Sequence, residues 1–269
     1  MKPAYSPRGY GLKAICVTPG NPAIGKDAHQ GGVMLFAAAT GEPLALVNAS
    51  AVTEIRTAAV SAVATGLLAR PGPAELAIIG TGVQGQAHAH ALAATRPLSG
   101  IRMTGRDLAR AREVAAELAG ALGLPVTAVG SVPEAVDGAD IVVTATNSPD
   151  PVLRREWLGA GTHVNAVGAC VPQAREIDTA TMAEAALFAD SRESVRNEAG
   201  DFLLAAQEGA DNPDRAELGE LLTGTAAGRA DDDEITVFES LGLAAEDLAA
   251  ASYLYEKATG LGAGTSADF

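Results

Sequence analysis

The chain contains 269 residues, of which 48% are hydrophobic and 19% charged, so it can bury a large core and is not a disordered chain. Its 33 acidic residues exceed the 19 basic ones and give a net charge of −14, which opposes binding to nucleic acid and to anionic membranes. Two cysteines are too few for a disulfide framework or a thiolate metal site. No apolar run reaches the roughly 18 residues of a membrane helix, and the N-terminus lacks the apolar core of a signal peptide, so we expect a cytoplasmic protein without a metal.

The N-terminal part of the chain is predicted to form short strands and turns. Strands are expected at residues 12–18, 33–37 and 43–47, separated by turns rich in Pro, Gly and Asn. An Ala-rich stretch with helical spacing follows at residues 51–68 and ends at the Pro-Gly-Pro sequence of residues 71–73.

From residue 76 onward, short apolar strands alternate with helices. The expected strands are 76–79, 101–104, 126–129, 140–145, 162–167 and 185–189, and the expected helices are 84–94, 108–122 and 132–136. This alternation is typical of parallel βαβ units covered on both faces. The sequence therefore predicts an α/β fold with a Rossmann-type doubly wound sheet at residues 63–239. Residues 1–62 and 240–269 are predicted to form a smaller α+β domain, with the final helix, 244–258, packed on the N-terminal segment.

A glycine-rich loop of sequence GTGVQG, at residues 80–85, lies between a predicted strand and a predicted helix. Gly80 permits a tight turn, Gly82 lets the backbone approach a pyrophosphate, and Gly85 allows the helix to pack closely on the strand. The phosphates would lie at the positive end of the helix, against its free backbone N–H groups. This context favours a dinucleotide site over a merely glycine-rich turn.

The end of the next strand indicates which dinucleotide binds. An NAD site usually has an Asp or Glu here to accept the ribose 2′-hydroxyl, whereas this chain has Gly105 and Arg106, with Arg110 one turn later. Two cations without an acid suit a 2′-phosphate, so NADP(H) is favoured and NAD(H) is the alternative. The competing interpretation is that Arg106 is a solvated residue at the helix start and that Asp107 caps the helix.

Further motifs occur in a fixed order along nearly the whole chain. They are GLK at 11–13, PGN at 19–21, HQG at 29–31, TGEPLA at 40–45, RTAAVSA at 56–62, the glycine loop with Gln84 and His88, HVNAVG at 163–168, EAGD at 198–201, ELGE at 217–220, and the segment around Ser240 and Gly242. Together they resemble the ornithine cyclodeaminase/mu-crystallin family, which includes cyclodeaminases, amino-acid dehydrogenases and ketimine reductases. The resemblance implies a homodimer whose smaller domain binds the substrate and forms the dimer.

The resemblance also implies roles for individual residues. Lys13 and Arg56 match the family's catalytic and substrate-carboxylate positions. His29, Cys170 and Glu198 are further substrate-binding candidates, although His29 is equally well explained as a structural turn residue and Cys170 as a small apolar filler. With the glycine loop and the strand-end cations included, the cofactor contacts are expected at Thr57, Gly80, Gly82, Val83, Gln84, Gly85, Arg106, Arg110, Thr146, Val167 and Ser240.

Three departures from the family pattern bear on the reaction. Cyclodeaminases carry a catalytic aspartate just after the NAVG stretch, where this chain has Cys170, and mu-crystallin-like reductases have a small polar residue there. Members also tend to have a Lys at the position of Glu239. They usually have a further N-terminal segment, with an Arg that helps to hold the substrate carboxylate.

The chemistry expected of Lys13 and Arg56 leads to a functional prediction. Arg56 offers a planar fork of donors for a carboxylate, and its place in an apolar helical stretch predicts a buried partner or ligand. Lys13 would either hydrogen-bond the same carboxylate or protonate an imine nitrogen, and partial burial beside Arg56 would lower its pKa toward the working pH. We therefore expect an NAD(P)H-dependent oxidoreductase of small amino or imino acids. The alternatives are an ornithine or lysine cyclodeaminase, which Cys170 disfavours, and a protein that binds NADPH and a small ligand without turnover. Glu198 and Asp201 are the remaining acid/base candidates.

Overall fold

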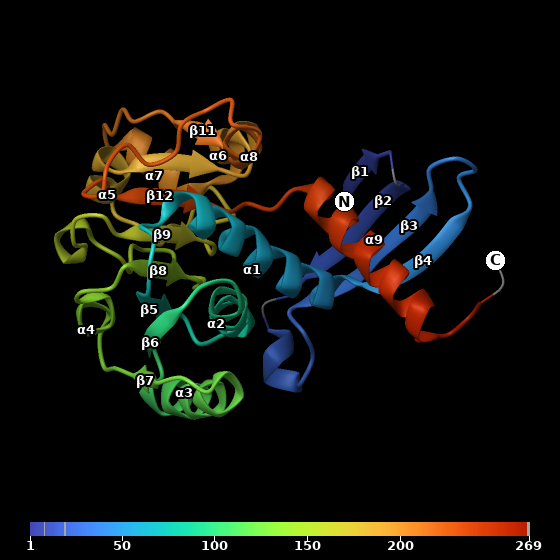
Figure 1. Cartoon of the computed structure of the whole chain (residues 1–269), viewed down its shortest axis with the longest axis horizontal. Coiled ribbons are helices and arrows are strands. Elements are labelled where there is room, and N and C mark those ends of the chain that lie inside the picture. The colour runs from blue at the N-terminus through green and yellow to red at the C-terminus, as the bar shows by residue number, and fades with distance from the viewer. Residues whose placement is uncertain (8, 19, 268–269) are drawn as a thin grey trace. The chain divides into compact units, whose positions relative to one another are not determined.

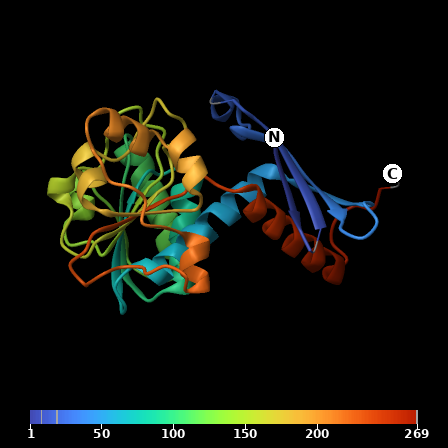
Figure 2. The same ribbon diagram turned by 90° about the horizontal axis from the view of Figure 1, so that it is seen from above.

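The computed structural model describes residues 1–7, 9–18 and 20–267, except for the side chains of Pro22 and His29. The chain divides into two compact units (Figures 1 and 2). Unit 1 comprises Met1–Arg56 and Gly242–Phe269, and unit 2 comprises Thr57–Leu241. Unit 1 is thus built from both ends of the chain. The boundaries predicted from the sequence lie at residues 62 and 239.

Unit 1 is an antiparallel sheet with one helix across a face. The strands follow chain order and are β1 (Lys2–Ser6), β2 (Gly9–Val17), β3 (His29–Ala37) and β4 (Pro43–Asn48), with the short 3-10 helix η1 (Asn21–Ile24) between β2 and β3. Helix α9 (Ala244–Leu261) packs on β1, β2 and β3, as Figure 1 shows. The predicted packing of the final helix on the N-terminal segment is therefore confirmed.

Strand alternation gives this sheet a buried face and an exposed face. In β2, Gly9, Gly11 and Lys13 are buried, whereas Tyr10 and Ala14, which alternate with them, are exposed. A Cβ on Gly11 would lie 2.9 Å from Cδ1 of Leu248, so the glycine lets α9 approach the sheet. The same alternation directs Lys13 toward the helix.

Unit 2 is the doubly wound α/β fold that the sequence predicts. Its eight strands lie in the order β11-β10-β12-β9-β8-β5-β6-β7, and each pairing is parallel. The strands are β5 (Ala74–Ile79), β6 (Leu98–Thr104), β7 (Val126–Ala128), β8 (Ile141–Thr144), β9 (His163–Ala166), β10 (Ala186–Ala189), β11 (Ala216–Glu217) and β12 (Thr236–Glu239). The helices are α1 (Ala49–Leu68), which begins in unit 1, α2 (Val83–Thr95), α3 (Leu108–Leu122), α4 (Val132–Val136), η2 (Arg155–Trp157), α5 (Thr179–Glu184), α6 (Arg192–Glu198), α7 (Gly200–Gln207) and α8 (Leu218–Thr223).

Apolar side chains on both faces of this sheet form the core of unit 2. In β5, Leu76 and Ile78 pack with residues of α2 and α3, whereas Ala77 and Ile79 pack with residues of α4, α5 and α7. Helices accordingly cover both faces of the sheet in Figures 1 and 2. The strand order reverses between β5 and β8, and open α/β sheets bind ligands at the carboxyl ends of the strands beside such a reversal.

Helix α1 is the one helix in the described residues that is long and apolar enough to cross a membrane, with a mean hydropathy of 1.2 over its best 18-residue window. Half of that window is buried in the folded chain. The core helix of a globular protein meets the same criteria, so the observation is weak support for a membrane span. Glu54 and Arg56 interrupt the apolar sequence of this helix.

Candidate functional site

The glycine-rich loop leaves the carboxyl end of β5 and leads directly into α2. Gly80 has a φ of +120°, and a Cβ on it would lie 2.3 Å from the carbonyl oxygen of Ala145. A Cβ on Gly85 would lie 2.1 Å from the carbonyl oxygen of Gly80, so both positions require glycine. Gly82 instead faces open space, and neither a capping side chain nor an acidic residue blocks the first turn of α2. The backbone N–H groups in the first turn of α2 therefore have no capping side chain and point toward open space at Gly82. This set of donors fits the pyrophosphate of a dinucleotide.

Four other cofactor candidates follow neighbouring strands of the sheet. Arg106 comes after β6, Thr146 after β8, Val167 after β9 and Ser240 after β12. Because the strands are parallel, these residues lie at one edge, the edge at which α/β folds bind their ligands. The buried hydroxyl of Ser240 has no hydrogen-bond partner within the described part of the chain. An unpaired buried hydroxyl at this edge fits a site whose polar partner is a ligand.

The residues after β6 have two interpretations from the sequence: Arg106 contacts a 2′-phosphate, or Arg106 is a solvated residue beside the helix cap Asp107. Asp107 caps α3, because its Oδ1 accepts hydrogen bonds from the N–H groups of Ala109 and Arg110 at 2.9 and 3.1 Å. Arg106 is exposed and forms no ion pair with any described residue, whereas Nη1 of Arg110 lies 3.2 Å from Oε2 of Glu113. The cap that the competing interpretation expected is present, and contact of Arg106 with a 2′-phosphate stays a prediction.

A buried cluster of opposite charges joins β2, α1 and α9 in unit 1. Nζ of Lys13 lies 2.8 Å from Oδ1 and 2.7 Å from Oδ2 of Asp247. Nε of Arg56 lies 3.2 Å from Oδ1 of Asp247, and its Nη1 lies 3.0 Å from Oε2 of Glu246. Lys13, Arg56 and Asp247 are only 3%, 8% and 1% exposed. One buried carboxylate thus contacts both residues that the sequence analysis named as catalytic.

The chain supplies each member of this cluster from a different kind of local structure. Lys13 lies on the helix-facing side of β2, and Arg56 lies on α1. Gly242, just before α9, has a φ of +82°, and a Cβ on it would lie 2.3 Å from Nη1 of Arg56. The glycine therefore lets the guanidinium lie against the backbone that leads into α9.

The expected buried partner of Arg56 is present, but no sequence pattern identified the residues that supply it. Glu246 and Asp247 lie in the first turn of α9, where acidic residues are usually explained by the helix dipole. The signal that could have singled them out is charge balance, because two buried cations in one small unit require acids from another of its elements.

Electrostatics in the cluster alter the acidity of Lys13. Burial lowers the pKa of its ammonium group, the hydrogen bond from Nζ to Asp247 opposes that effect, and the nearby charge of Arg56 adds to it. A lysine with a lowered pKa releases its proton more readily, which suits a proton donor to an imine nitrogen.

The other substrate candidates do not join a buried cluster in the described residues. The backbone of His29 begins β3, but its side chain lies outside the described part of the structure. Cys170 is exposed, and its Sγ lies 3.4 Å from the carbonyl oxygen of Val167. Glu198 is exposed at the C-terminal end of α6. No group of three or more potential metal ligands occurs in the ranges that the structure describes.

His88 has a structural role at the start of α2. Its Nε2 lies 2.9 Å from Oγ of Ser61, and its Nδ1 lies 2.7 Å from the carbonyl oxygen of Gln84. Burial lowers the pKa of His88 to about 4, so the imidazole is neutral at pH 7. It links α1 to the first turn of α2 and thereby steadies the helix that follows the glycine loop.

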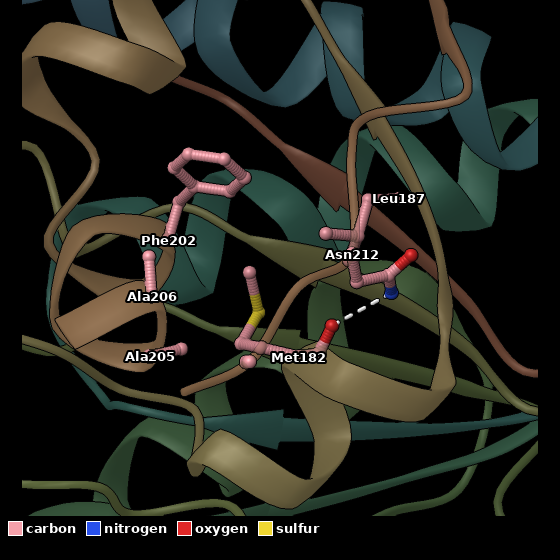
Figure 3. Close-up of a pocket in the computed structure, with 7 residues that line it drawn as sticks. Met182, Leu187, Phe202, Ala205, Ala206 and Asn212 are labelled. Carbon is pink, nitrogen blue, oxygen red and sulfur yellow. Dashed lines mark hydrogen bonds between the residues drawn. The ribbon is translucent and has the colours of Figure 1, made fainter. Parts of the chain in front are cut away.

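A small pocket in unit 2, drawn in Figure 3, contains none of the candidate residues. It is formed by Met182, Leu187, Phe202, Ala205, Ala206, Ala210 and Asn212, and has an empty volume of about 160 Å³. Nδ2 of Asn212 donates a hydrogen bond to the carbonyl oxygen of Met182 at 2.8 Å (Figure 3). Part of that volume is open to solvent, and the one polar side chain of the pocket already has hydrogen-bond partners, so we assign it no ligand.

Comparison with known proteins identifies the family. The model of the ornithine cyclodeaminase/mu-crystallin family matches residues 1–262. Δ1-Pyrroline-2-carboxylate reductase of Bacillus cereus is 41% identical over 262 residues, which cover 96% of this chain and 80% of that protein. The structure of Thermococcus litoralis Δ1-pyrroline-2-carboxylate reductase in complex with NADH and L-proline is similar, with a TM-score of 0.93, 36% identity, and coverage of 96% of this chain and 81% of that one. An archaeal alanine dehydrogenase dimer with bound NAD also has a TM-score of 0.93, at 30% identity, with coverage of 99% and 83%. The chain therefore belongs to the ornithine cyclodeaminase/mu-crystallin family.

Proposed function

We propose that this protein reduces the C=N bond of small cyclic imino acids, with a nicotinamide dinucleotide as the hydride donor. The observation that carries the proposal is the buried pair of Lys13 and Arg56 around Asp247. A cyclic imino acid such as Δ1-pyrroline-2-carboxylate has its imine nitrogen and its carboxylate on the same carbon. An ammonium group beside a guanidinium group matches those two features.

Each residue of the pair would contribute a different part of the chemistry. Arg56 would bind the substrate carboxylate, because its planar donors suit two parallel hydrogen bonds. Lys13 would hold a proton at Nζ and donate it to the imine nitrogen, and Asp247 would keep that ammonium group oriented. The bound cofactor would supply the hydride to the imine carbon, and the glycine loop with the residues that follow β6, β8, β9 and β12 would hold the cofactor.

We infer a preference for NADP(H) over NAD(H). Solved relatives contain NADH or NAD. The inference is supported by the exposed Arg106 and by the absence of an acid directly after β6. Fluorescence titration should give a tighter dissociation constant for NADPH than for NADH, and Arg106→Ala should weaken NADPH about tenfold while changing NADH less than about twofold. Tighter binding of NADH by the unmodified protein would make the inference wrong.

We further propose that unit 1 forms a homodimer through the face of its sheet that α9 leaves open. Tyr5 pairs with Tyr10 across β1 and β2, and Met34 pairs with Leu46 across β3 and β4, so these side chains share that face. Tyr5, Tyr10 and Leu46 are 65%, 44% and 68% exposed. Exposed apolar patches of this kind mark interaction surfaces. Light scattering should give twice the chain mass of 27.0 kDa, and Leu46→Arg should reduce it to the chain mass.

The proposed function is tested by the oxidation of NADPH and of NADH with five- and six-membered cyclic imino acids as substrates. Turnover that falls by about a thousandfold or more in Lys13→Met supports the proposal. Release of ammonia from ornithine with NAD⁺ would identify a cyclodeaminase instead. Tight nucleotide binding without turnover of any of these substrates would identify a binding protein.

A further inference from the structure

Glu176 lies in the segment between β9 and α5, and its carboxylate reaches two strand ends. One oxygen, Oε1, accepts a hydrogen bond from the N–H of Thr146 at 2.5 Å, and Oε2 accepts one from the N–H of Gly168 at 2.6 Å. Thr146 follows β8, and Gly168 follows β9. A Cβ on Gly168 would lie 2.0 Å from the carbonyl oxygen of Thr146 and 2.6 Å from the Glu176 carboxylate. The buried side chain of Glu176 thus connects, by hydrogen bonds, the loop after β8 and the loop after β9, which are tightly packed against each other.

A second buried carboxylate holds Glu176 in place. Oδ1 of Asp201, in the first turn of α7, accepts hydrogen bonds from the N–H groups of Glu176 and Ile177, both at 2.7 Å. The carbonyl oxygen of Glu176 also accepts hydrogen bonds from the N–H groups of Val152 and Leu153, at 2.8 and 2.9 Å. Both the backbone and the side chain of Glu176 are therefore fixed.

The charges around Glu176 indicate which carboxyl group is ionised. Oδ2 of Asp201 and Oε1 of Glu239 are buried without hydrogen-bond partners in the described residues. Burial raises the pKa of Asp201 to about 8, with the nearby carboxylate of Glu176 adding to the shift and Arg175 opposing it. Burial, Asp201, Glu176 and Asp190 together raise the pKa of Glu239 well above its ordinary value. Burial raises the pKa of Glu176 as well, but the hydrogen bonds from Thr146 and Gly168 oppose that shift. Because both of its oxygens accept short bonds, Glu176 is the carboxyl group of the three whose charge is best stabilised, and the raised pKa values of Asp201 and Glu239 favour their protonated forms at pH 7.

We propose that Glu176 is a positioning residue, which fixes the loops after β8 and β9 in the arrangement that receives the dinucleotide. The loops contain Thr146 and Val167, two of the expected cofactor contacts, so the inference rests on the proposed function. Asp201 positions Glu176, and the protonated Glu239 lets a single negative charge remain in the cluster. Without the two hydrogen bonds to Glu176, the chain would keep its sheet and its glycine loop but would bind the cofactor weakly.

The test compares Glu176→Gln with Glu239→Gln, a matched change at another buried glutamate of the same cluster. A glutamine at 176 retains one acceptor oxygen and presents an NH2 group to the second backbone N–H, so one of the two bonds is lost. A glutamine at 239 mimics the protonated carboxyl group already present. Hydrogen exchange at the amides of Thr146 and Gly168, measured by NMR without cofactor or substrate, should accelerate about tenfold or more in Glu176→Gln only. The dissociation constant for NADPH should rise about tenfold in the same variant, while both variants retain similar melting temperatures.

The exchange measurement separates this inference from the proposed function, because it requires neither turnover nor a bound ligand. Unchanged exchange at these two amides in folded Glu176→Gln would overturn the inference, and so would faster exchange with an unchanged affinity for NADPH. If Glu176→Gln does not fold, the unmodified protein decides the matter. Its Thr146 and Gly168 amides should then exchange as slowly as those inside β8 and β9, and exchange at the rate of an exposed loop would overturn the inference.

Discussion

Replacing Asp247 by Asn removes a charge that the buried cluster of unit 1 needs. The Asp247 carboxylate lies 2.7–2.8 Å from Nζ of Lys13 and 3.2 Å from Nε of Arg56, and the residue is 1% exposed. Removing one partner of a buried ion pair costs about 3–5 kcal/mol, because the remaining charge stays buried without compensation. Arg56 keeps its contact with Glu246, so we expect the lower end, about 3 kcal/mol. For a chain of this size, that corresponds to a decrease of about 6–12 °C in the melting temperature.

Two further variants isolate the contribution of the Asp247 charge. Glu246→Gln changes the neighbouring acid on α9, whose side chain is 13% exposed and contacts Arg56, and should cost less than Asp247→Asn because Arg56 keeps its contact with Asp247. The double variant Lys13→Met with Asp247→Asn removes both members of the close pair and should recover at least half of the loss. Urea unfolding followed by circular dichroism measures all three. A loss below about 1 kcal/mol in Asp247→Asn, or a loss equal to that of Glu246→Gln, would refute the reasoning.

The same variant has a second, kinetic consequence. The hydrogen bond to Asp247 raises the pKa of Lys13 against the effect of burial, so its loss lowers that pKa further. Lys13 then loses its proton at a lower pH. If Lys13 protonates the imine, the alkaline limb of the kcat/KM profile should move to lower pH in Asp247→Asn and remain in place in Glu246→Gln. An unmoved limb in a folded Asp247→Asn protein would show that Lys13 is not the proton donor.

Three other perturbations have defined outcomes. Gly80→Ala places a Cβ 2.3 Å from the carbonyl oxygen of Ala145 at a φ of +120°, so titration should show NADPH affinity reduced by about a hundredfold or more. Arg56→Lys keeps the charge but loses the planar fork, and steady-state kinetics should show KM for the imino acid raised about tenfold. The pKa of Asp201 is about 8 in the folded chain, whereas its ordinary value is 3.8. Between these two pH values unfolding releases the proton of Asp201, so the free energy of unfolding should fall as the pH rises from about 4 to 8. Asp201→Asn cannot ionise, and urea unfolding at several pH values should show a flatter dependence.

The sequence predicted best those elements that carry their own end signals. Helix α3 begins and ends where expected, at residues 108 and 122, because Asp107 caps its first turn and Gly123, with a φ of +67°, ends it. Helix α4 is equally well bounded, since Ser131 accepts a hydrogen bond from the N–H of Glu134. The glycine loop was identified for the same reason, because its residue types and its spacing are local properties of the chain.

Elements without local signals were missed. Strand β1 is a short edge strand that contains Pro3, and it exists because it pairs with β2 from Lys2 to Ser6. Helices α5 to α8 contain six to eight residues each, too few for a helical period to stand out. Asp247 was missed for a related reason, since its contact with Lys13 joins positions 234 residues apart.

The buried acids show why composition alone could not locate the candidate residues of either unit. A surplus of acidic residues suggests a solvated surface, yet Glu176, Asp201, Glu239 and Asp247 are all at most 2% exposed. Asp247 is tolerated because cations contact it, whereas the other three are tolerated because backbone N–H groups and retained protons balance them. The two kinds of buried acid respond to different perturbations. Loss of a neighbouring cation destabilises the surroundings of Asp247, whereas a rise in pH removes the protons that Asp201 and Glu239 retain. The unfolding of Lys13→Met should therefore be compared with the unfolding of the unmodified protein at alkaline pH. The comparison would show whether unit 1 and unit 2 lose stability independently when their buried carboxylates are perturbed.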